Sequence, residues 1–228
     1  MKYRIYEAAI LAAGIIVLGF CIKSGIDNFA NKDRRVTVKG LAEQQVMADD
    51  VSWTFTTTMQ GDDIGALSKQ VSGELNAIRK WLVEKGINSS DTITVEPPTV
   101  VNNYDNMYNN KKPMFKYTLT RLMIVGSHRT KVINRIEGQK GELFDRGIYY
   151  YTDISSYSYT QFQKLKPQMM QMAIVNAEKT AKQFAENSHS QLNKILEAGQ
   201  GEFSIDDGDK PYLKKVRVVS TITYSLKD

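Results

Sequence analysis

The chain has 228 residues, of which 42% are hydrophobic and 24% are charged, and its formal net charge is +5. These values are ordinary for a folded protein and exclude a disordered chain or a collagen-like repeat. The basic and acidic residues are interspersed, which argues against a surface built to neutralise nucleic-acid phosphates. One Cys and two His leave too few ligands for a disulfide framework or a Cys/His zinc site. We therefore expect no nucleic-acid partner, no metal ion and no cofactor.

Residues 1–24 are predicted to form an N-terminal signal anchor or transmembrane helix. Ala8–Ile22 is an uncharged run, preceded by Lys2 and Arg4 and followed by Lys23. As a helix this run is about 22 Å long, shorter than the ~30 Å hydrocarbon core of a bilayer. The flanking basic residues do not by themselves choose an orientation, because they lie on both sides of the run.

Two interpretations of this segment stay open. A removed signal peptide needs small residues just before its cleavage site, and no such pair follows the apolar run cleanly. An uncleaved anchor is therefore the preferred interpretation, with residues 25–33 as a polar linker to the rest of the chain.

Two segments after the linker have regularly spaced hydrophobic residues. Val51–Met59 alternates between apolar and hydroxyl-bearing residues, which predicts a strand with one buried face. Ile64–Leu82 carries apolar residues at spacings of three and four, which predicts a helix. Asp62 and Asp63 are candidate N-caps for it, and Gly86 is placed to end it.

The same patterns predict the remaining elements. Strands are expected at Val36–Gly40, Thr92–Val95, Thr99–Val101, Phe115–Val125, Gly147–Tyr151, Ser155–Tyr159, Leu192–Glu197 and Lys215–Leu226. Helices are expected at His128–Glu137 and over a longer stretch that begins between Gln161 and Pro167 and ends near Asn187. This order predicts an α+β domain over residues 34–228, with helices packed on one face of a largely antiparallel sheet.

Residues capable of catalysis are sparse. His128 follows a predicted strand and His189 follows the long helix, and neither belongs to a recognisable nucleophile motif. Both are interpreted as solvated turn residues, and a hydrolase built on either is the weakest of three functional hypotheses. Met169–Met172 is interpreted as core packing on the long helix rather than as a Cu(I) site.

Tyrosine density gives the clearest functional signal. Asn102–Pro113 holds two tyrosines among five asparagines, and a run of three tyrosines follows at residues 149–151. Tyrosine suits contact surfaces because it is large and amphipathic and has few rotamers. We therefore predict an interaction surface that includes Tyr104, Tyr108, Tyr149 and Tyr150.

Three segments together carry a family resemblance. They are Arg35–Glu43 (RVTVKGLAE), Lys112–Tyr117 (KPMFKY), and the stripe of alanines at every fourth residue from Ala173 to Ala185. With the apolar N-terminus, they resemble the SIMPL domain family of bacterial envelope proteins, which includes periplasmic immunogens and oxidative-stress-associated proteins. The resemblance implies an α+β domain, an envelope or periplasmic location, ring-like homo-oligomers in some members, and no catalytic residues.

The leading hypothesis is a non-enzymatic protein of the bacterial inner membrane whose domain faces the periplasm. In this hypothesis it self-associates or binds an envelope protein partner and is linked to envelope or oxidative stress. The alternative is a small-molecule-binding or stress-sensing module with a pocket between sheet and helices. The alternative location is the periplasm, or outside the cell, after signal cleavage.

Overall fold

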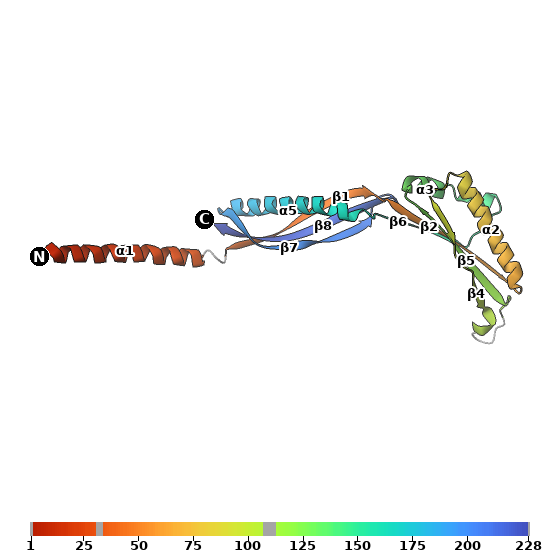
Figure 1. The fold of residues 1–228 in the computed structure, drawn as a ribbon, viewed down its shortest axis with the longest axis horizontal. Coiled ribbons are helices and arrows are strands. Elements are labelled where there is room, and N and C mark those ends of the chain that lie inside the picture. Colours follow the sequence, from red (N-terminus) through yellow and green to blue (C-terminus); the bar gives the residue numbers. More distant parts are fainter. Residues whose placement is uncertain (1, 31–33, 107–112, 228) are drawn as a thin grey trace. The chain divides into compact units, whose positions relative to one another are not determined.

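The computed structural model describes residues 2–30, 34–106 and 113–227. The chain divides into two compact units (Figure 1). Unit 1 comprises Met1–Gln44, Gln163–Ser204 and Val216–Asp228, and unit 2 comprises Gln45–Phe162 and Ile205–Lys215. The predicted α+β class is confirmed, with two antiparallel sheets and helices.

The N-terminal segment forms helix α1 (Lys2–Ala30), which continues past the predicted end of the anchor at residue 24. Its uncharged stretch is the run Ala8–Ile22, with charged residues in the sequence on both sides. Among the described residues, no helix is long and apolar enough to cross a membrane. The predicted transmembrane span is therefore not confirmed.

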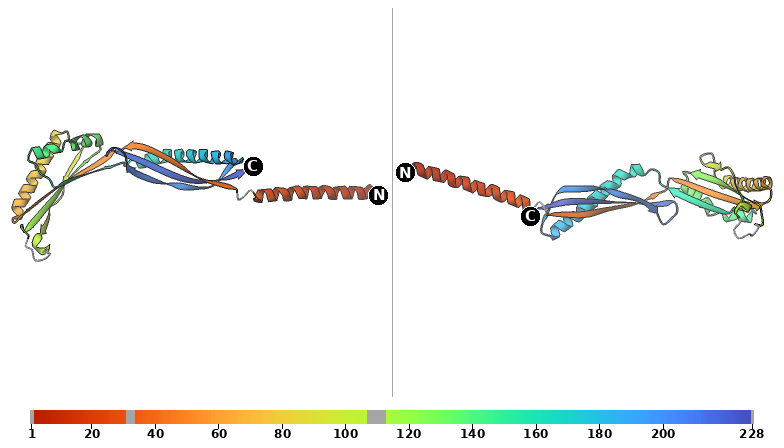
Figure 2. Two further views of the ribbon diagram at one scale, coloured as in Figure 1. Left: turned by 180° about the vertical axis from the view of Figure 1, so that it is seen from behind. Right: turned by 90° about the horizontal axis from the view of Figure 1, so that it is seen from below.

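Unit 1 contains a three-stranded sheet with one long helix. The strands are β1 (Arg35–Met47), β7 (Gln191–Asp207) and β8 (Leu213–Lys227), in the order β1-β8-β7. Helix α5 (Phe162–Asn187) lies along one face of this sheet (Figure 2). It begins inside the predicted interval and ends at the predicted residue.

The contact between α5 and β1 depends on small residues. Ala173 and Ala177 on the buried side of α5 are fully buried. Opposite them, a Cβ atom on Gly40 would lie 1.9 Å from the backbone oxygen of Ala173. The amide of Asn176 also donates to the backbone oxygen of Leu41 at 2.7 Å. The helix backbone therefore rests directly on the strand backbone, at a distance that only glycine permits.

Unit 2 is built on a five-stranded antiparallel sheet. Its strands are β2 (Asp50–Gly61), β3 (Thr92–Val95), β4 (Thr99–Asn102), β5 (Tyr117–Ser127) and β6 (Thr152–Ser158). The order is β3-β5-β2-β6, and β4 also pairs with β5. Strand β6 thus forms one edge of the sheet, while β3 and β4 lie at the opposite edge.

Helices α2 (Ile64–Glu84) and α3 (Thr130–Glu137) lie against one face of this sheet (Figure 1). Alternate residues of β2 point into the core between the layers, as the period of two predicted. The rings of Trp53 and Phe55 are tilted by 42° to each other at a centroid distance of 4.4 Å, and the ring of Trp81 from α2 meets Trp53 edge-on at 6.5 Å. All three rings are almost fully buried.

Both predicted ends of α2 are confirmed. Asp63 is the N-cap, and its carboxylate accepts the backbone N–H of Ala66 at 2.9 Å. Gly86 follows the helix with a φ of 111°, the left-handed conformation that glycine adopts without strain. Ile87 is buried directly after it, which supplies the hydrophobic contact expected at a helix end.

The structure differs from the sequence prediction at two places before β6. Residues 147–151 were predicted as a strand but form a loop, because Gly147 has a φ of 72° and the N–H of Tyr149 donates to Glu74 on α2. The short helix α4 (Gly141–Asp145) was not predicted, since five residues are too few to show a helical period. The resulting loop between α4 and β6 carries the three consecutive tyrosines.

Candidate functional site

The strongest candidate for a functional surface is a group of aromatic side chains between α4 and β6. We call Phe144, Tyr149, Tyr150 and Tyr151 the aromatic surface. Tyr149 is 60% exposed and Tyr151 is 76% exposed, and Phe144 is also exposed. Such a concentration of exposed aromatic rings is typical of contact surfaces.

Tyr150 fixes the aromatic surface to the core. Its ring meets Phe55 edge-on at 5.5 Å and stacks on Phe144 at 5.0 Å. Tyr149 lies 6.3 Å from Phe144 between ring centroids, and its backbone N–H is held by Glu74. The rings of Phe144 and Tyr149 are therefore held by packing, and the backbone of the segment by hydrogen bonding, which reduces the entropy lost when they bind a partner.

A hollow of about 250 Å³ lies beside the aromatic surface. We call it the tyrosine hollow; its lining residues are Thr57, Thr58, Met59, Tyr149, Tyr150 and Tyr151. All six are uncharged. Thr57 is 1% exposed, and its hydroxyl is the one buried side-chain polar atom among the described residues that has no hydrogen-bond partner.

The phenol of Tyr150 has an altered acidity. The pKa of Tyr150 is raised from 10.0 to about 12. The largest cause is burial, and the negative charge of Asp153 and a hydrogen bond to Asp153 add to it. The Asp153 carboxylate also accepts from Lys140 at 2.8 Å and from the indole N–H of Trp53 at 3.1 Å. Tyr150 is therefore held as a neutral phenol between the core and a charged network.

We expect this shift to be visible in an alkaline titration followed by ultraviolet absorbance. The Tyr150 phenol should ionise near pH 12 in wild type, and Tyr150→Phe should lose this part of the absorbance change. Because the folded pKa lies above the unfolded one, Tyr150 should also destabilise the wild type as the pH rises from about 10 to about 12. Equal alkaline stability profiles for wild type and Tyr150→Phe would contradict this assignment.

The predicted contact residues do not form one patch. Tyr149 and Tyr150 lie together beside β6, at one edge of the sheet of unit 2. Tyr104 lies in the single turn η2 (Asn103–Asn106) that follows β4 at the opposite edge, where it is half-buried. Tyr108 lies outside the described residues.

The prediction also missed two members of the aromatic surface. Tyr151 belongs to the predicted dense run but was not singled out as a contact residue. Phe144 was missed because its role depends on α4, and no periodic pattern revealed that helix.

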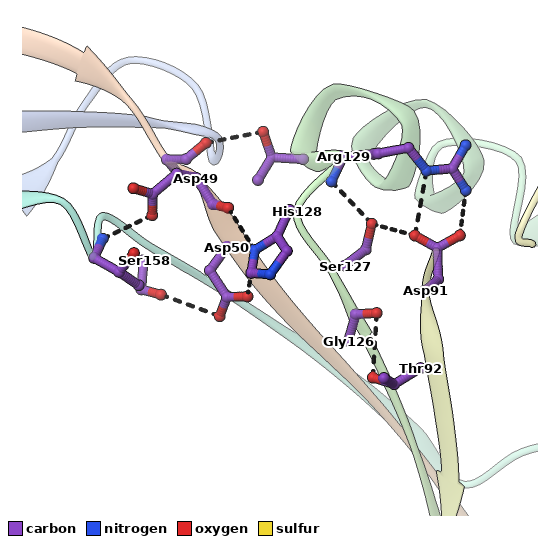
Figure 3. Close-up of polar contacts among 12 residues, drawn as sticks. Asp49, Asp50, Asp91, Thr92, Gly126, Ser127, His128, Arg129 and Ser158 are labelled. Atoms are coloured by element: carbon purple, nitrogen blue, oxygen red, sulfur yellow. Dashed lines mark hydrogen bonds and ion pairs between the residues drawn. The ribbon is translucent and has the colours of Figure 1, made fainter. Parts of the chain in front are cut away.

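A polar network surrounds His128 in unit 2 (Figure 3). Its Nδ1 atom lies 3.0 Å from the backbone oxygen of Asp49 and 3.3 Å from a carboxylate oxygen of Asp50. The hydroxyl of Ser158 points to Asp50, and the hydroxyl of Ser127 donates to Asp91 at 2.6 Å. Neither hydroxyl is held against the imidazole, so the described contacts assemble no Ser-His-Asp nucleophile here.

The Asp49 carboxylate has a structural role in this network. It accepts the backbone N–H groups of Thr160 at 2.7 Å and Gln161 at 3.1 Å. Burial acts to raise the pKa of Asp49, but these hydrogen bonds outweigh it and hold that pKa below its ordinary value. These hydrogen bonds connect Asp49, just before β2, to Thr160 and Gln161, just after β6.

Comparison with known families supports the resemblance seen in the sequence. A family described as "SIMPL: Protein of unknown function (DUF541)" matches residues 36–219. The chain belongs to the SIMPL family. The match covers most of both units, including the Gly40 contact and the aromatic surface. No curated protein matches the SIMPL chain closely enough to be counted as a relative.

The remaining candidates in the SIMPL chain show no assembled chemistry. His189 follows α5 with a φ of 53° and is exposed. The neighbouring hydroxyl of Ser188 donates to the backbone oxygen of Ala185 at 3.0 Å. Met169 is fully buried against the sheet of unit 1. Within the described ranges, no three His, Cys, Asp or Glu side chains gather into a metal-binding group.

Proposed function

We propose that this SIMPL protein is a non-enzymatic cell-envelope protein that self-associates through the aromatic surface of unit 2. One observation carries the proposal. The rings of Tyr149 and Tyr151 are exposed to solvent, while the ring of Tyr150 between them packs against the core residue Phe55. Buried aromatic anchors contribute most of the binding energy in many interfaces. A rigid aromatic patch at a sheet edge suits that role.

The first test is the solution mass of the full chain by light scattering across a dilution series. A stable oligomer supports the proposal, and a monomer at every concentration contradicts it. A dissociation constant from the same series then provides the scale on which variants are compared.

Removing the two exposed rings should weaken this association. The double variant Tyr149→Ala/Tyr151→Ala should raise the dissociation constant at least tenfold, since truncating one interface anchor typically costs about 1–2 kcal/mol or more. Its unfolding temperature should stay close to wild type, because both rings are mostly exposed. Light scattering and thermal unfolding, followed by circular dichroism, measure the two quantities.

Phe184→Ala is the matched control, because Phe184 is a similarly exposed aromatic residue on α5 in unit 1. It should leave the mass unchanged. Equal weakening by Phe184→Ala would indicate a general loss of apolar surface and would contradict a specific role for the aromatic surface.

A second candidate function is the binding of a neutral small molecule in the tyrosine hollow. The lining of the hollow favours it, because all six lining residues are uncharged and suit a neutral ligand. This function predicts a rise in unfolding temperature that grows with ligand concentration, without a change in protein mass. A neutral-metabolite library is a suitable set of probes.

The membrane tether and the periplasmic orientation are part of the same proposal. They are supported by the apolar run and by the family resemblance. Alkaline extraction of membranes tests the tether, because an embedded chain stays in the pellet. A C-terminal alkaline phosphatase fusion tests the orientation, because that enzyme is active only after export.

A further inference from the structure

Helix α5 covers only part of the sheet of unit 1. Its buried alanines pack over β1 and β8, since Ala177 lies in one cluster with Val38 of β1 and Ile222 of β8. Strand β7 lies at the edge of the sheet beyond β8. Ile195 and Leu196 are neighbours on β7 and point to opposite faces, yet both are about half exposed. The helix therefore leaves much of β7 uncovered.

An apolar hollow of about 230 Å³ lies between α5 and this edge of the sheet. We call it the α5–β7 hollow; its lining residues are Met170, Ile174, Ala198, Gly199, Ser220 and Ile222. None of the six is charged. The hydroxyl of Ser220 is directed to the sulfur of Met170 at 4.0 Å. All six residues belong to unit 1, so the hollow is separate from the aromatic surface.

Gly199 leaves space in the hollow that a side chain would fill. Apart from its neighbours in the chain, a Cβ atom on Gly199 would meet only the backbone oxygen of Thr221, at 3.6 Å, which is an ordinary contact. Gly201 lies on the same face of the strand. A Cβ atom there would lie 2.9 Å from the Oγ atom of Ser220, so this is the face that borders the hollow. Packing therefore does not require glycine at position 199, and its missing side chain enlarges the hollow.

A basic residue lies at one end of the hollow. Lys166, Met170 and Ile174 follow one another at intervals of four on α5, so they form one row along the helix. The ammonium of Lys166 lies 5.7 Å from the ring centroid of Phe203 on β7. Among the described residues Lys166 forms no ion pair. Its charge is therefore available to an anionic group bound at this end.

The other end of the hollow is acidic. Glu178 continues the same row one turn after Ile174, and its carboxylate is paired with Lys182 at 2.7 Å. On β7, Glu197 directly precedes Ala198. An anionic group is therefore disfavoured at this end and attracted to Lys166, which selects one orientation for a charged ligand.

The size of the hollow suits a single short hydrocarbon chain. An apolar cavity of about 150 Å³ holds benzene, a molecule of six carbon atoms. In proportion, a hollow of about 230 Å³ holds roughly eight or nine carbon atoms. A chain of this length with one anionic group at its end is a medium-chain fatty acid.

We propose that the α5–β7 hollow binds a free medium-chain fatty acid, with its carboxylate at Lys166 and its chain directed toward Ile174. The uncharged lining and the limited volume suit the chain, and the unpaired ammonium suits the carboxylate. The site does not depend on the proposed self-association, because its residues lie in unit 1 and the aromatic surface lies in unit 2.

The first test is isothermal titration calorimetry of the full chain with hexanoate, octanoate and decanoate, below their micelle-forming concentrations. Each buried methylene contributes about 0.8 kcal/mol, so octanoate should bind about fifteenfold more tightly than hexanoate. The gain from octanoate to decanoate should be smaller, because the hollow is filled near eight or nine carbon atoms. Equal dissociation constants for hexanoate and octanoate would overturn the proposal.

The second test fills the hollow. Gly199→Leu should weaken octanoate binding at least tenfold, because its side chain occupies the space of the hydrocarbon chain. Its unfolding temperature should not fall, since the added Cβ meets only an ordinary contact. Gly73→Leu is the matched control: Gly73 lies on α2 in unit 2, away from the hollow, and this variant should bind octanoate as wild type does.

The third test removes the positive charge. Lys166→Met keeps much of the side-chain length and should weaken octanoate binding about threefold, as expected for a partly exposed ion pair. The neutral probe 1-octanol should bind equally to this variant and to wild type. Lys179→Met, at an exposed lysine elsewhere on α5, should leave octanoate binding unchanged. Equal octanoate affinities for Lys166→Met and wild type would contradict the position given to the carboxylate.

The remaining outcomes identify other occupants. If Gly199→Leu changes the solution mass of the chain but not its octanoate affinity, the hollow receives a side chain of a second copy and the fatty-acid proposal is wrong. If Gly199→Leu reduces only the binding to phosphatidylglycerol vesicles, the ligand is a membrane lipid, and the proposal of a free fatty acid is again wrong. A monomeric wild type would contradict the proposed self-association and leave the evidence for this site unchanged.

Discussion

Replacing Gly40 with alanine is expected to lower the free energy of unfolding by about 3 kcal/mol, the upper range for overpacking of a core. The added Cβ would lie 1.9 Å from the backbone oxygen of Ala173 and 2.7 Å from the backbone nitrogen of Ala177. These are backbone atoms of α5, so no side-chain rotation relieves the contact and the helix must move off the strand. Denaturant unfolding followed by circular dichroism measures the loss.

Gly73→Ala provides the matched control. Gly73 lies inside α2, and apart from the helix's own neighbouring backbone no atom lies within 4 Å of the position its Cβ would take. Alanine should therefore stabilise the chain by roughly 0.5–1 kcal/mol, since it is the better helix former. The same substitution should act in opposite directions at the two glycines. A neutral Gly40→Ala would show that α5 is not held at this distance from β1.

These glycines illustrate what sequence patterns reveal. The period of three and four predicted α2 and its buried side, and Asp63 and Gly86 marked its ends, because these features depend on neighbours within the chain. The role of Gly40 depends on residues more than a hundred positions away on α5. The sequence singled out Gly40 only as part of the motif that resembles the SIMPL family.

One strand is longer than predicted and runs through two glycines. The predicted strand ends at Glu197, and Gly199 and Gly201 follow it in the sequence. In the structure β7 continues to Asp207, and a Cβ on Gly201 would lie 2.5 Å from the side chain of Val218. Gly201 is therefore a place of close packing inside a strand, and not an interruption of it.

The candidate site was predictable only in part. The alternation of Val51–Met59 correctly placed Thr57 on the buried face of its strand. It carried no sign that the Thr57 hydroxyl lacks a partner, because that depends on which side chains pack around it in the folded chain. The run of tyrosines suggested both a strand and a contact surface. The strand is wrong, and the contact surface stays a prediction.

Asp91→Asn should be the most destabilising polar substitution, at about 3 kcal/mol or more. The Asp91 side chain is completely buried and forms an ion pair with Arg129. It also accepts from the Ser127 hydroxyl at 2.6 Å (Figure 3). The backbone N–H of Asn88 donates to it at 3.0 Å. An asparagine would turn one acceptor oxygen into a donor and leave the Arg129 charge without its partner. Urea unfolding at neutral pH measures the effect, and Asp145→Asn, on the exposed side of α4, should change it little.

The pH dependence of that loss distinguishes an ionic role from a purely steric one. Burial acts to raise the pKa of Asp91, but hydrogen bonds from Arg129, Ser127 and Asn88 and the charge of Arg129 outweigh it and hold the pKa below 3.8. The folded state thus favours the carboxylate, whose stabilisation is present above about pH 4 and is lost as the pH falls through the folded pKa. The difference in unfolding free energy between wild type and Asp91→Asn should therefore shrink as the solution is acidified. A difference that stays constant from neutral to acidic pH would mean that the carboxylate acts through its shape, and that the charge of Arg129 is balanced elsewhere.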